Sequence, residues 1–364
     1  MRPDHPVPMC RVCLRHRFLR PLRHRWPLWL LLGAAVLLVT TRFVELKDLG
    51  TTLAEGRWQW MAAAIALQAA YYFLYAVLYR AGYATVGVES RVLDLIPVML
   101  ASIVVGTLTP AGGLSSAAVM IDGATRRHQS AARAAEGVLL VWVAGVAMAV
   151  PLLAIGLGYL RSRGVLVLYE VLAALAFILY AAALFAMLFL AKWRDAWLRA
   201  ALGWVQGLID ALLARMRRPG LPEGWAERNA GEAAGAAAAI AARPRLLGLT
   251  LALALGTHLL NLASLAAIFL AFDHALAFGA LSAAYTLGFV LAVLSVIPFD
   301  LGVLAGVMAL VYSSVGVPVA RALVISVAFR GINAWLPVAL GFLLVRRVWP
   351  GGGQGPAGPD TPPE

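Results

Sequence analysis

The sequence contains few charged residues and almost no cysteine. Asp, Glu, Lys and Arg make up 13% of its 364 residues and hydrophobic residues 62%, whereas about 25% charged is typical of soluble domains. A soluble catalytic domain is therefore excluded. The two cysteines, Cys10 and Cys13, cannot form a disulfide framework, and although with His16 they could begin a metal site, no second pair completes four ligands. We expect no metal and no cofactor.

Lysine is also scarce, since Lys47 and Lys192 are the only two, and the net charge of +12 comes from arginine. The arginines lie in the tails and loops between apolar runs. This distribution is typical of membrane orientation and of contact with anionic lipid head groups. We therefore expect no nucleic acid partner, and instead membrane lipids with anionic or modified head groups.

Long apolar runs dominate the rest of the chain. A hydrocarbon core of about 30 Å requires roughly 20 apolar residues per helical span, and the runs lack the alternation of barrel strands. We predict an all-α integral membrane protein with about six spanning helices and two helical hairpins broken by proline and glycine, about eight helices in all. The apolar regions cover residues 26–41, 58–79, 92–121, 134–160, 165–190, 246–272, 275–312 and 319–345.

The chain is expected to divide into three parts. A basic cytoplasmic tail covers residues 1–25, a polytopic membrane domain residues 26–347, and a disordered Gly/Pro-rich tail residues 348–364. The apolar run at 26–41 could be a secretory signal, but no small-x-small cleavage site follows it, so we expect an uncleaved span.

A cytoplasmic amphipathic segment, residues 192–245, is inserted into the membrane domain. Trp193, Trp197 and Trp204 recur at helical spacing among polar residues, which predicts an amphipathic helix at the cytoplasmic interface. An extension packed on the helical bundle fits the pattern equally well.

Two apolar regions are interrupted by proline and glycine. Residues 109–113 read Thr-Pro-Ala-Gly-Gly, and residues 297–302 read Ile-Pro-Phe-Asp-Leu-Gly. Such clusters bend or end a helix. Non-helical backbone at membrane depth is tolerated only where protein buries it or where it lines a cavity. Both regions are therefore interpreted as hairpins, either re-entrant or fully spanning.

The placement of charge orients these hairpins. If each returns to the side from which it entered, Arg126, Arg127 and the 192–245 segment, with nine basic and five acidic residues, all fall on the cytoplasmic side with both termini. A single crossing would export the basic segment. Three spans separate the hairpins, so the hairpins enter from opposite faces, an arrangement that allows the inverted repeat known from transporters.

Ionisable and polar residues within the apolar regions are candidates for substrate binding. Asp300 and Arg330 either lock the second hairpin to the last helix or contact a charged head group, and the second interpretation is favoured. Interhelical hydrogen bonding explains polar residues in the 246–272 region adequately, with substrate contact as the alternative. The candidate residues are Pro110, Gly112, Gly113, Ser115, Ser116, Thr257, His258, Asn261, Pro298, Asp300, Gly302, Arg330 and Asn333.

No catalytic arrangement accompanies these residues. Ser115 and Ser116 lack a Ser-His-Asp set or a nucleophile elbow, so we expect their hydroxyls to line a cavity or meet a phosphate. No phosphate-binding loop, dinucleotide fingerprint or metal-ligand cluster occurs in the sequence. The chain is therefore not expected to be an enzyme.

The motifs resemble the flippase-like membrane domain of lysylphosphatidylglycerol synthases, as a stand-alone relative without the soluble synthase domain. The resemblance rests on residues 109–113 with the turn Arg-Arg-His-Gln-Ser-Ala at 126–131. It rests equally on Pro298, Gly302, Gly316-Val317-Pro318, Arg330, Trp335-Leu336-Pro337 and Gly341. The family's second break usually reads Pro-Gly-Gly-x-Gly, followed by an acid. Here Phe299 and Asp300 replace two glycines, and Ala305 stands where the acid is expected.

The resemblance implies a lipid flippase or transporter that moves a lipid with a polar or charged head group across the bacterial cytoplasmic (inner) membrane. An aminoacylated phospholipid or a polyprenyl-linked sugar would be such a substrate. The alternative is a non-transporting membrane scaffold for a lipid- or envelope-modifying enzyme, which would use the 192–245 segment. Under these hypotheses the protein partner is either a second copy of the chain, forming a homodimer, or an envelope-biosynthesis enzyme.

Overall fold

A computed structural model of the chain describes residues 57–337, apart from residues 110–111, 194, 216–219 and 295–300. The described residues form eleven α-helices, α3 to α13, and a short π-helical segment, without a strand among them. The all-α prediction is confirmed. The helices outnumber the expected eight because each broken region contributes two helices and the polar insertion another two. The expected span at 26–41 and both tails lie outside the described residues.

Four of the described helices are long and apolar enough to cross a membrane. A 28-residue helix measures about 42 Å, which exceeds the hydrocarbon thickness of about 30 Å. The four helices are α3 (Trp58–Thr85), α6 (Ala131–Ser162), α7 (Leu168–Trp193) and α10 (Pro244–Ala271). Turns follow three of the four, α3, α6 and α10, and Gly164, at a φ of +69°, provides the left-handed position that ends α6.

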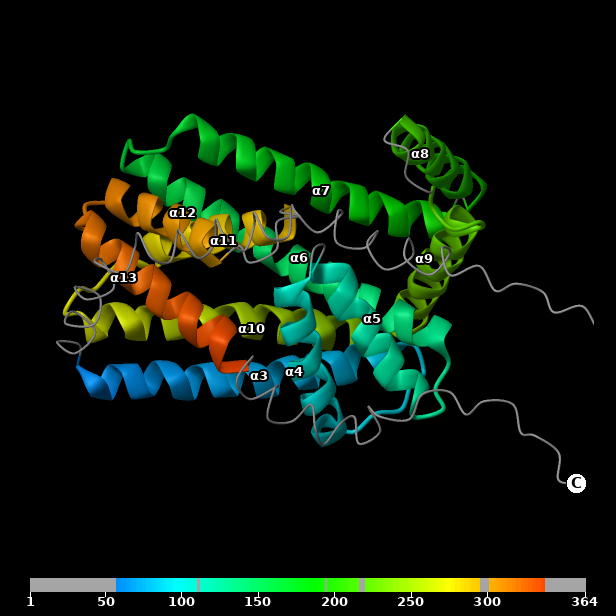
Figure 1. Cartoon of the computed structure of the whole chain (residues 1–364), viewed down its shortest axis with the longest axis horizontal. Coiled ribbons are helices and arrows are strands. Elements are labelled where there is room, and N and C mark those ends of the chain that lie inside the picture. The colour runs from blue at the N-terminus through cyan, green and yellow to red at the C-terminus, as the bar shows by residue number, and fades with distance from the viewer. Residues whose placement is uncertain (1–56, 110–111, 194, 216–219, 295–300, 338–364) are drawn as a thin grey trace, which may run out of the picture. The chain divides into compact units, whose positions relative to one another are not determined.

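Helices α3 and α10 pack antiparallel along their lengths (Figure 1). At one end the backbone N–H of Arg57 donates to the carbonyl of Ala271 at 2.8 Å. At the other end the guanidinium of Arg243 donates to the carbonyl of Ala84 at 2.6 Å and satisfies the last carbonyls of α3. We refer to these two ends of the bundle as the Arg57 end and the Arg243 end.

The first broken region forms an antiparallel helix pair, α4 (Val92–Leu108) and α5 (Gly112–Thr125). Ser116 donates from Oγ to the carbonyl of Ser102 at 2.8 Å, near the break. At the open end Arg127 donates to the carbonyl of Asp94 at 3.3 Å. Because α4 follows α3 after its Arg243 end, this pair opens toward the Arg243 end.

The second broken region forms a similar pair, α11 (Phe278–Leu294) and α12 (Leu301–Ser314). The start of α11 lies against the end of α6, where Gly279 faces the side chain of Tyr159. The end of α12 lies beside the end of α10, where the rings of Tyr312 and Phe269 meet edge to face at 4.7 Å. This pair therefore opens toward the Arg57 end, opposite to the first pair (Figure 1).

The expected last span, residues 319–345, is described as far as residue 337. It begins as α13 (Val319–Arg330) and continues as a π-helical segment over Gly331–Trp335. A π turn inserts an extra residue into the helical repeat and occurs frequently at functional sites.

The polar insertion folds into two helices, α8 (Asp195–Arg215) and α9 (Trp225–Ala242), near the Arg243 end (Figure 1). The two pack on each other through a small apolar cluster that includes Leu198, Ala230 and Ala233. Asp210 also accepts a hydrogen bond from the backbone N–H of Leu221 at 2.6 Å, which closes the turn between the helices.

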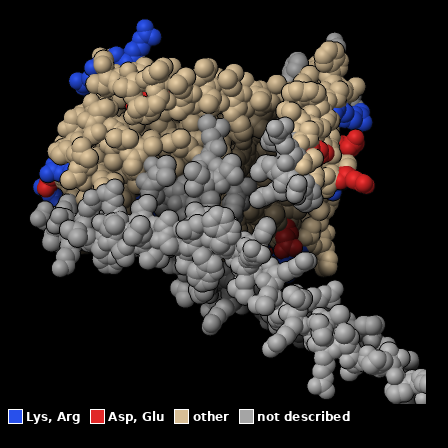
Figure 2. Space-filling model, turned by 45° about the horizontal axis from the view of Figure 1, so that its top comes forward, with Lys and Arg blue, Asp and Glu red and all other residues tan. Residues whose placement is uncertain are grey.

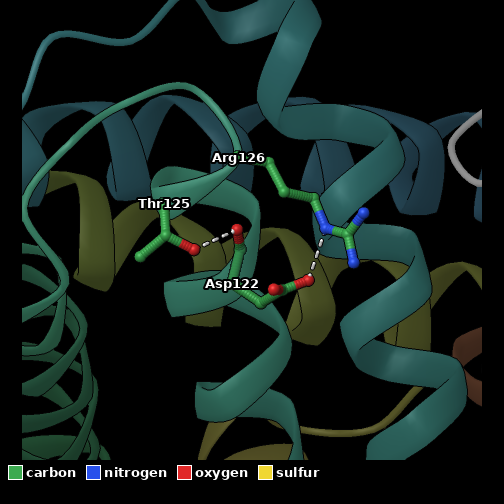
Figure 3. Close-up of polar contacts among 3 residues, drawn as sticks. All are labelled: Asp122, Thr125 and Arg126. Carbon is green, nitrogen blue, oxygen red and sulfur yellow. Dashed lines mark hydrogen bonds and ion pairs between the residues drawn. The ribbon is translucent and has the colours of Figure 1, made fainter. Parts of the chain in front are cut away.

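Uncharged residues cover most of the described surface in Figure 2, and Lys, Arg, Asp and Glu gather toward the ends; many large hydrophobic side chains, such as Leu172, Leu179 and Phe185, are exposed. Such a surface is costly in water and suits hydrocarbon. At the Arg243 end, Asp122 is one of the charged residues, and it forms polar contacts with two neighbours (Figure 3). Its carboxylate accepts from Nε of Arg126 at 2.7 Å, and its carbonyl accepts from the hydroxyl of Thr125 at 2.8 Å.

Candidate functional site

A cavity of about 190 Å³ lies within the bundle, beside the second helix pair, α11 and α12. Aromatic rings and polar groups from α3, α6, α10, α11, α12, α13 and the π-helical segment line it. Five of the residues predicted for substrate binding converge here: Thr257, His258, Asn261, Arg330 and Asn333.

Among the described residues that line the cavity, Arg330 is the one charged residue. It is the last residue of α13 and directly precedes the π-helical segment. Its side chain is partly buried, and its Nε atom is fully so. A guanidinium at membrane depth is stabilised by anions and by strong hydrogen-bond acceptors that face it. The cavity therefore favours a negatively charged group.

The side chain of Asn333 joins the π-helical segment to α10. Its Nδ2 donates to Oδ1 of Asn261 at 2.7 Å. The hydroxyl of Tyr72 donates to the backbone carbonyl of Asn333 at 2.9 Å, so α3 also holds this segment. Together the two contacts fix the cavity wall beside Arg330.

His258 connects three helices from within α10. Its Nε2 lies 3.0 Å from the carbonyl of Gly145 on α6, and its Nδ1 lies 2.8 Å from the hydroxyl of Tyr285 on α11. A carbonyl oxygen can only accept, so Nε2 carries the proton, and in the neutral ring Nδ1 accepts from Tyr285. The ring of Phe289 meets the imidazole edge to face at 5.2 Å. His258 is thus fully used in holding the cavity wall together.

Thr257 lies beside His258 and also lines the cavity, but its hydroxyl donates to the carbonyl of Ala254 at 2.7 Å on its own helix. Back-bonding of this kind satisfies the hydroxyl without a partner from another helix. The residue therefore contributes a small polar surface to the wall, and its hydrogen bond lies within α10 instead of between helices as expected.

The aromatic lining comes largely from residues that sequence reasoning missed. Tyr71 and Tyr75 line the cavity from α3, and their rings stack at 5.6 Å. Trp142 lines it from α6 and donates to the hydroxyl of Tyr180 at 2.8 Å. The signal was present, because Tyr71, Tyr75, Tyr79 and Tyr83 recur every fourth residue and therefore share one helical face.

The described residues predicted for the first hairpin, Gly112, Gly113, Ser115 and Ser116, lie outside the cavity lining. Gly113, near the start of α5, lies so close to the ring of Trp142 that a Cβ atom there would stand 2.7 Å from it. Gly112 approaches the backbone of Gly106 closely. Ser116 is occupied by its bond to Ser102. Ser115 is half-buried on the same helix.

Trp142 of α6 therefore lies close to Gly113, near the start of α5, and also lines the cavity. Leu304 and Met308 of α12 line the cavity from the opposite pair. Of the other predicted residues, Gly302 lies in the first turn of α12, while Pro110, Pro298 and Asp300 lie outside the described residues. The predicted pairing of Asp300 with Arg330 stays a prediction.

The described residues contain no cluster of three or more His, Cys, Asp or Glu side chains that could hold a metal ion. What the site presents is one guanidinium, amide and hydroxyl groups, and the faces and edges of aromatic rings. Such a set can bind an anionic group by charge-assisted hydrogen bonds and an attached polar or planar group by stacking.

Comparison with known proteins identifies one family. The family described as "Lysylphosphatidylglycerol synthase TM region" matches residues 28–341. The match includes both broken regions, the cavity and the polar insertion. No curated protein matches the chain.

Proposed function

The chain belongs to the lysylphosphatidylglycerol synthase transmembrane-region family, and from that premise we propose that it moves a lipid with a polar or charged head group across the membrane. Family membership and the four long apolar helices make it a multi-pass membrane protein with a role connected to membrane lipids. Transport, and not catalysis, is the part that we propose.

The two helix pairs are proposed to be re-entrant hairpins. Helices α4 and α5 contain 17 and 14 residues, which corresponds to about 25 and 21 Å, less than the hydrocarbon core of about 30 Å. Helices α11 and α12 have the same lengths. A pair that returns to the end from which it started leaves its break inside the bilayer, where the surrounding helices shield it.

The observation that carries the proposal is Arg330 in a cavity lined by the second pair, within a bundle whose two helix pairs open toward opposite ends. Opposed broken helices that meet at a central site are the architecture of transporters with inverted repeats. An anionic head group would leave the aqueous side at one pair, bind beside Arg330, and leave along the other. The acyl chains would remain in the bilayer throughout.

We propose that the Arg243 end faces the cytoplasm of a bacterial cell. Arg126, Arg127, Arg133 and Arg243 lie at this end, together with the basic polar insertion. Positive charge is retained on the cytoplasmic side of membrane proteins.

Reconstitution into vesicles tests the proposal. Fluorescent lipids with anionic, aminoacylated or polyprenyl-phosphate-linked sugar head groups are placed in both leaflets, and dithionite is added outside to quench the outer label. With the protein present, the protected fraction of at least one of these lipids should fall, because inner label reaches the outer leaflet. Protection equal to that of protein-free vesicles for every head group would overturn the proposal.

A further inference from the structure

Helix α8 has two apolar faces, and only one of them is covered. Leu198 is 3% exposed and packs with Ala230, Ala233 and Ala237 of α9. On the other face Trp197 is 66% exposed, Trp204 is 70% exposed and Leu208 is 57% exposed. Residues separated by four and seven positions lie on one side of a helix. These three residues define what we call the tryptophan face of α8.

A helix that served only as an extension packed on the bundle would need the α9-facing side alone. Large apolar side chains gathered on a second, exposed face mark a site of contact with a membrane or another protein. Tryptophan in particular is enriched where membrane helices reach the water interface, because its ring is apolar and its N–H is polar.

Large apolar side chains are also exposed on α7, the spanning helix that directly precedes α8 in the chain. Along α7 the large side chains of Leu172, Leu175, Leu179 and Phe185 are exposed, as expected of a helix surrounded by hydrocarbon. The last residue of α7, Trp193, is 66% exposed, and α8 begins two residues later. Exposed apolar side chains thus occur along α7 to its last residue and again on α8.

Charge also favours lipid as the partner that covers the tryptophan face. Residues 192–245 carry nine basic and five acidic side chains. This segment is therefore net positive, and it lies near the Arg243 end of the bundle. Anionic head groups attract such segments, and a helix with tryptophan on one face and basic residues nearby lies in the interface with its apolar face toward the acyl chains.

We propose that α8 lies in the head-group region of an anionic bilayer, with its tryptophan face buried against the acyl chains. Helix α9 then covers the opposite face of α8 and connects it to the bundle. The spanning helices of the same chain thereby gain a lateral anchor, and this holds whether or not the protein moves lipid.

Spin labels at single cysteines measure this depth directly. In a background with Cys10→Ser and Cys13→Ser, labels enter through Trp197→Cys and Trp204→Cys. The matched controls are Arg199→Cys and Gly203→Cys, which are exposed positions on other sides of the same helix. The whole protein is placed, one copy per disc, in nanodiscs that contain phosphatidylglycerol.

Labels on the tryptophan face should collide with oxygen several-fold more often, relative to a water-soluble nickel chelate, than the control labels do. Equal access of the nickel chelate to all four positions would overturn the proposal. That result is also the one expected if a protein partner or a second copy of the chain covers this face in the cell, because neither is present in the disc.

Discussion

Asn333 donates from Nδ2 to Oδ1 of Asn261 at 2.7 Å, across 72 positions of sequence. The bond ties the π-helical segment that follows Arg330 to the centre of α10. Because both amides line the cavity, the contact holds the wall from which the guanidinium is presented. This hydrogen bond and the contacts around it have measurable consequences.

Coupling between the two amides should be detectable in a double-mutant cycle. Asn261→Leu and Asn333→Leu each break the bond, and the double variant should lose less free energy of unfolding than the sum of the single losses. The expected coupling is about 0.6 kcal/mol, the average for interhelical hydrogen bonds in membranes. Denaturation in mixed micelles measures it, and strictly additive losses would show that the bond contributes nothing.

His258→Phe should destabilise the protein by about 1–3 kcal/mol, because the carbonyl of Gly145 and the hydroxyl of Tyr285 both lose a buried partner. The neighbouring Leu259 is 42% exposed and faces away from this cluster, so Leu259→Ala is the matched control. The free energy of unfolding of both variants is compared with wild type. Equal losses in the two variants would contradict the bridging role of His258.

Two glycines of α6 provide a close test of how α6 packs on α11. A Cβ atom at Gly156 would lie 2.5 Å from Cα of Ala283, whereas one at Gly158 meets nothing within 4 Å. Gly156→Ala should therefore cost about 1–3 kcal/mol through overpacking. Gly158→Ala should be neutral or stabilise by up to about 1 kcal/mol through helix propensity. Thermal melts of both variants measure the difference in stability. A Gly156→Ala protein as stable as the wild type would refute the close packing of α6 on α11.

Single cysteines test the two opposed hairpins. In a cysteine-free background, Arg91→Cys and His128→Cys flank the first pair, and His274→Cys and Val315→Cys flank the second. A membrane-impermeant maleimide should label the first two positions from one side of the membrane and the last two from the other. Labelling of Arg91→Cys and His128→Cys from opposite sides would show that the first pair spans the membrane.

The sequence predicted helix positions well because the periodic signals are local. Proline at 110 and 298 predicted where the two apolar regions break, and helices end within two residues of the first break and four of the second. The charge pattern predicted that the hairpins face opposite ways, and the described helix pairs do open toward opposite ends. Their placement in a bilayer remains a prediction.

The cavity was harder to predict, since it depends on contacts between distant segments. Arg330, Asn333 and Asn261 were identified individually as polar residues in apolar runs, but nothing local indicates that Asn333 meets Asn261. Conversely, Ser116 looked like a binding residue and instead bonds to Ser102. Tyr71 and Tyr75 went unnoticed because tyrosine in an apolar helix is usually taken as an interface anchor.

The most direct measurement is the rate of lipid exchange between leaflets in reconstituted vesicles for Arg330→Ala, with Arg321→Ala as the matched control. Both residues lie on α13, but Arg321 is exposed whereas Arg330 lines the cavity. Loss of a charge-assisted hydrogen bond to a head group is worth about 1.5–3 kcal/mol, so exchange should slow by about tenfold or more.

Arg330→Lys should retain part of the rate, because it keeps the charge but not the bidentate geometry of guanidinium. Circular dichroism and gel filtration must show all three variants folded. We predict slow exchange for Arg330→Ala and a wild-type rate for Arg321→Ala. A folded Arg330→Ala protein that exchanges the lipid as fast as wild type would contradict a transport path through this cavity.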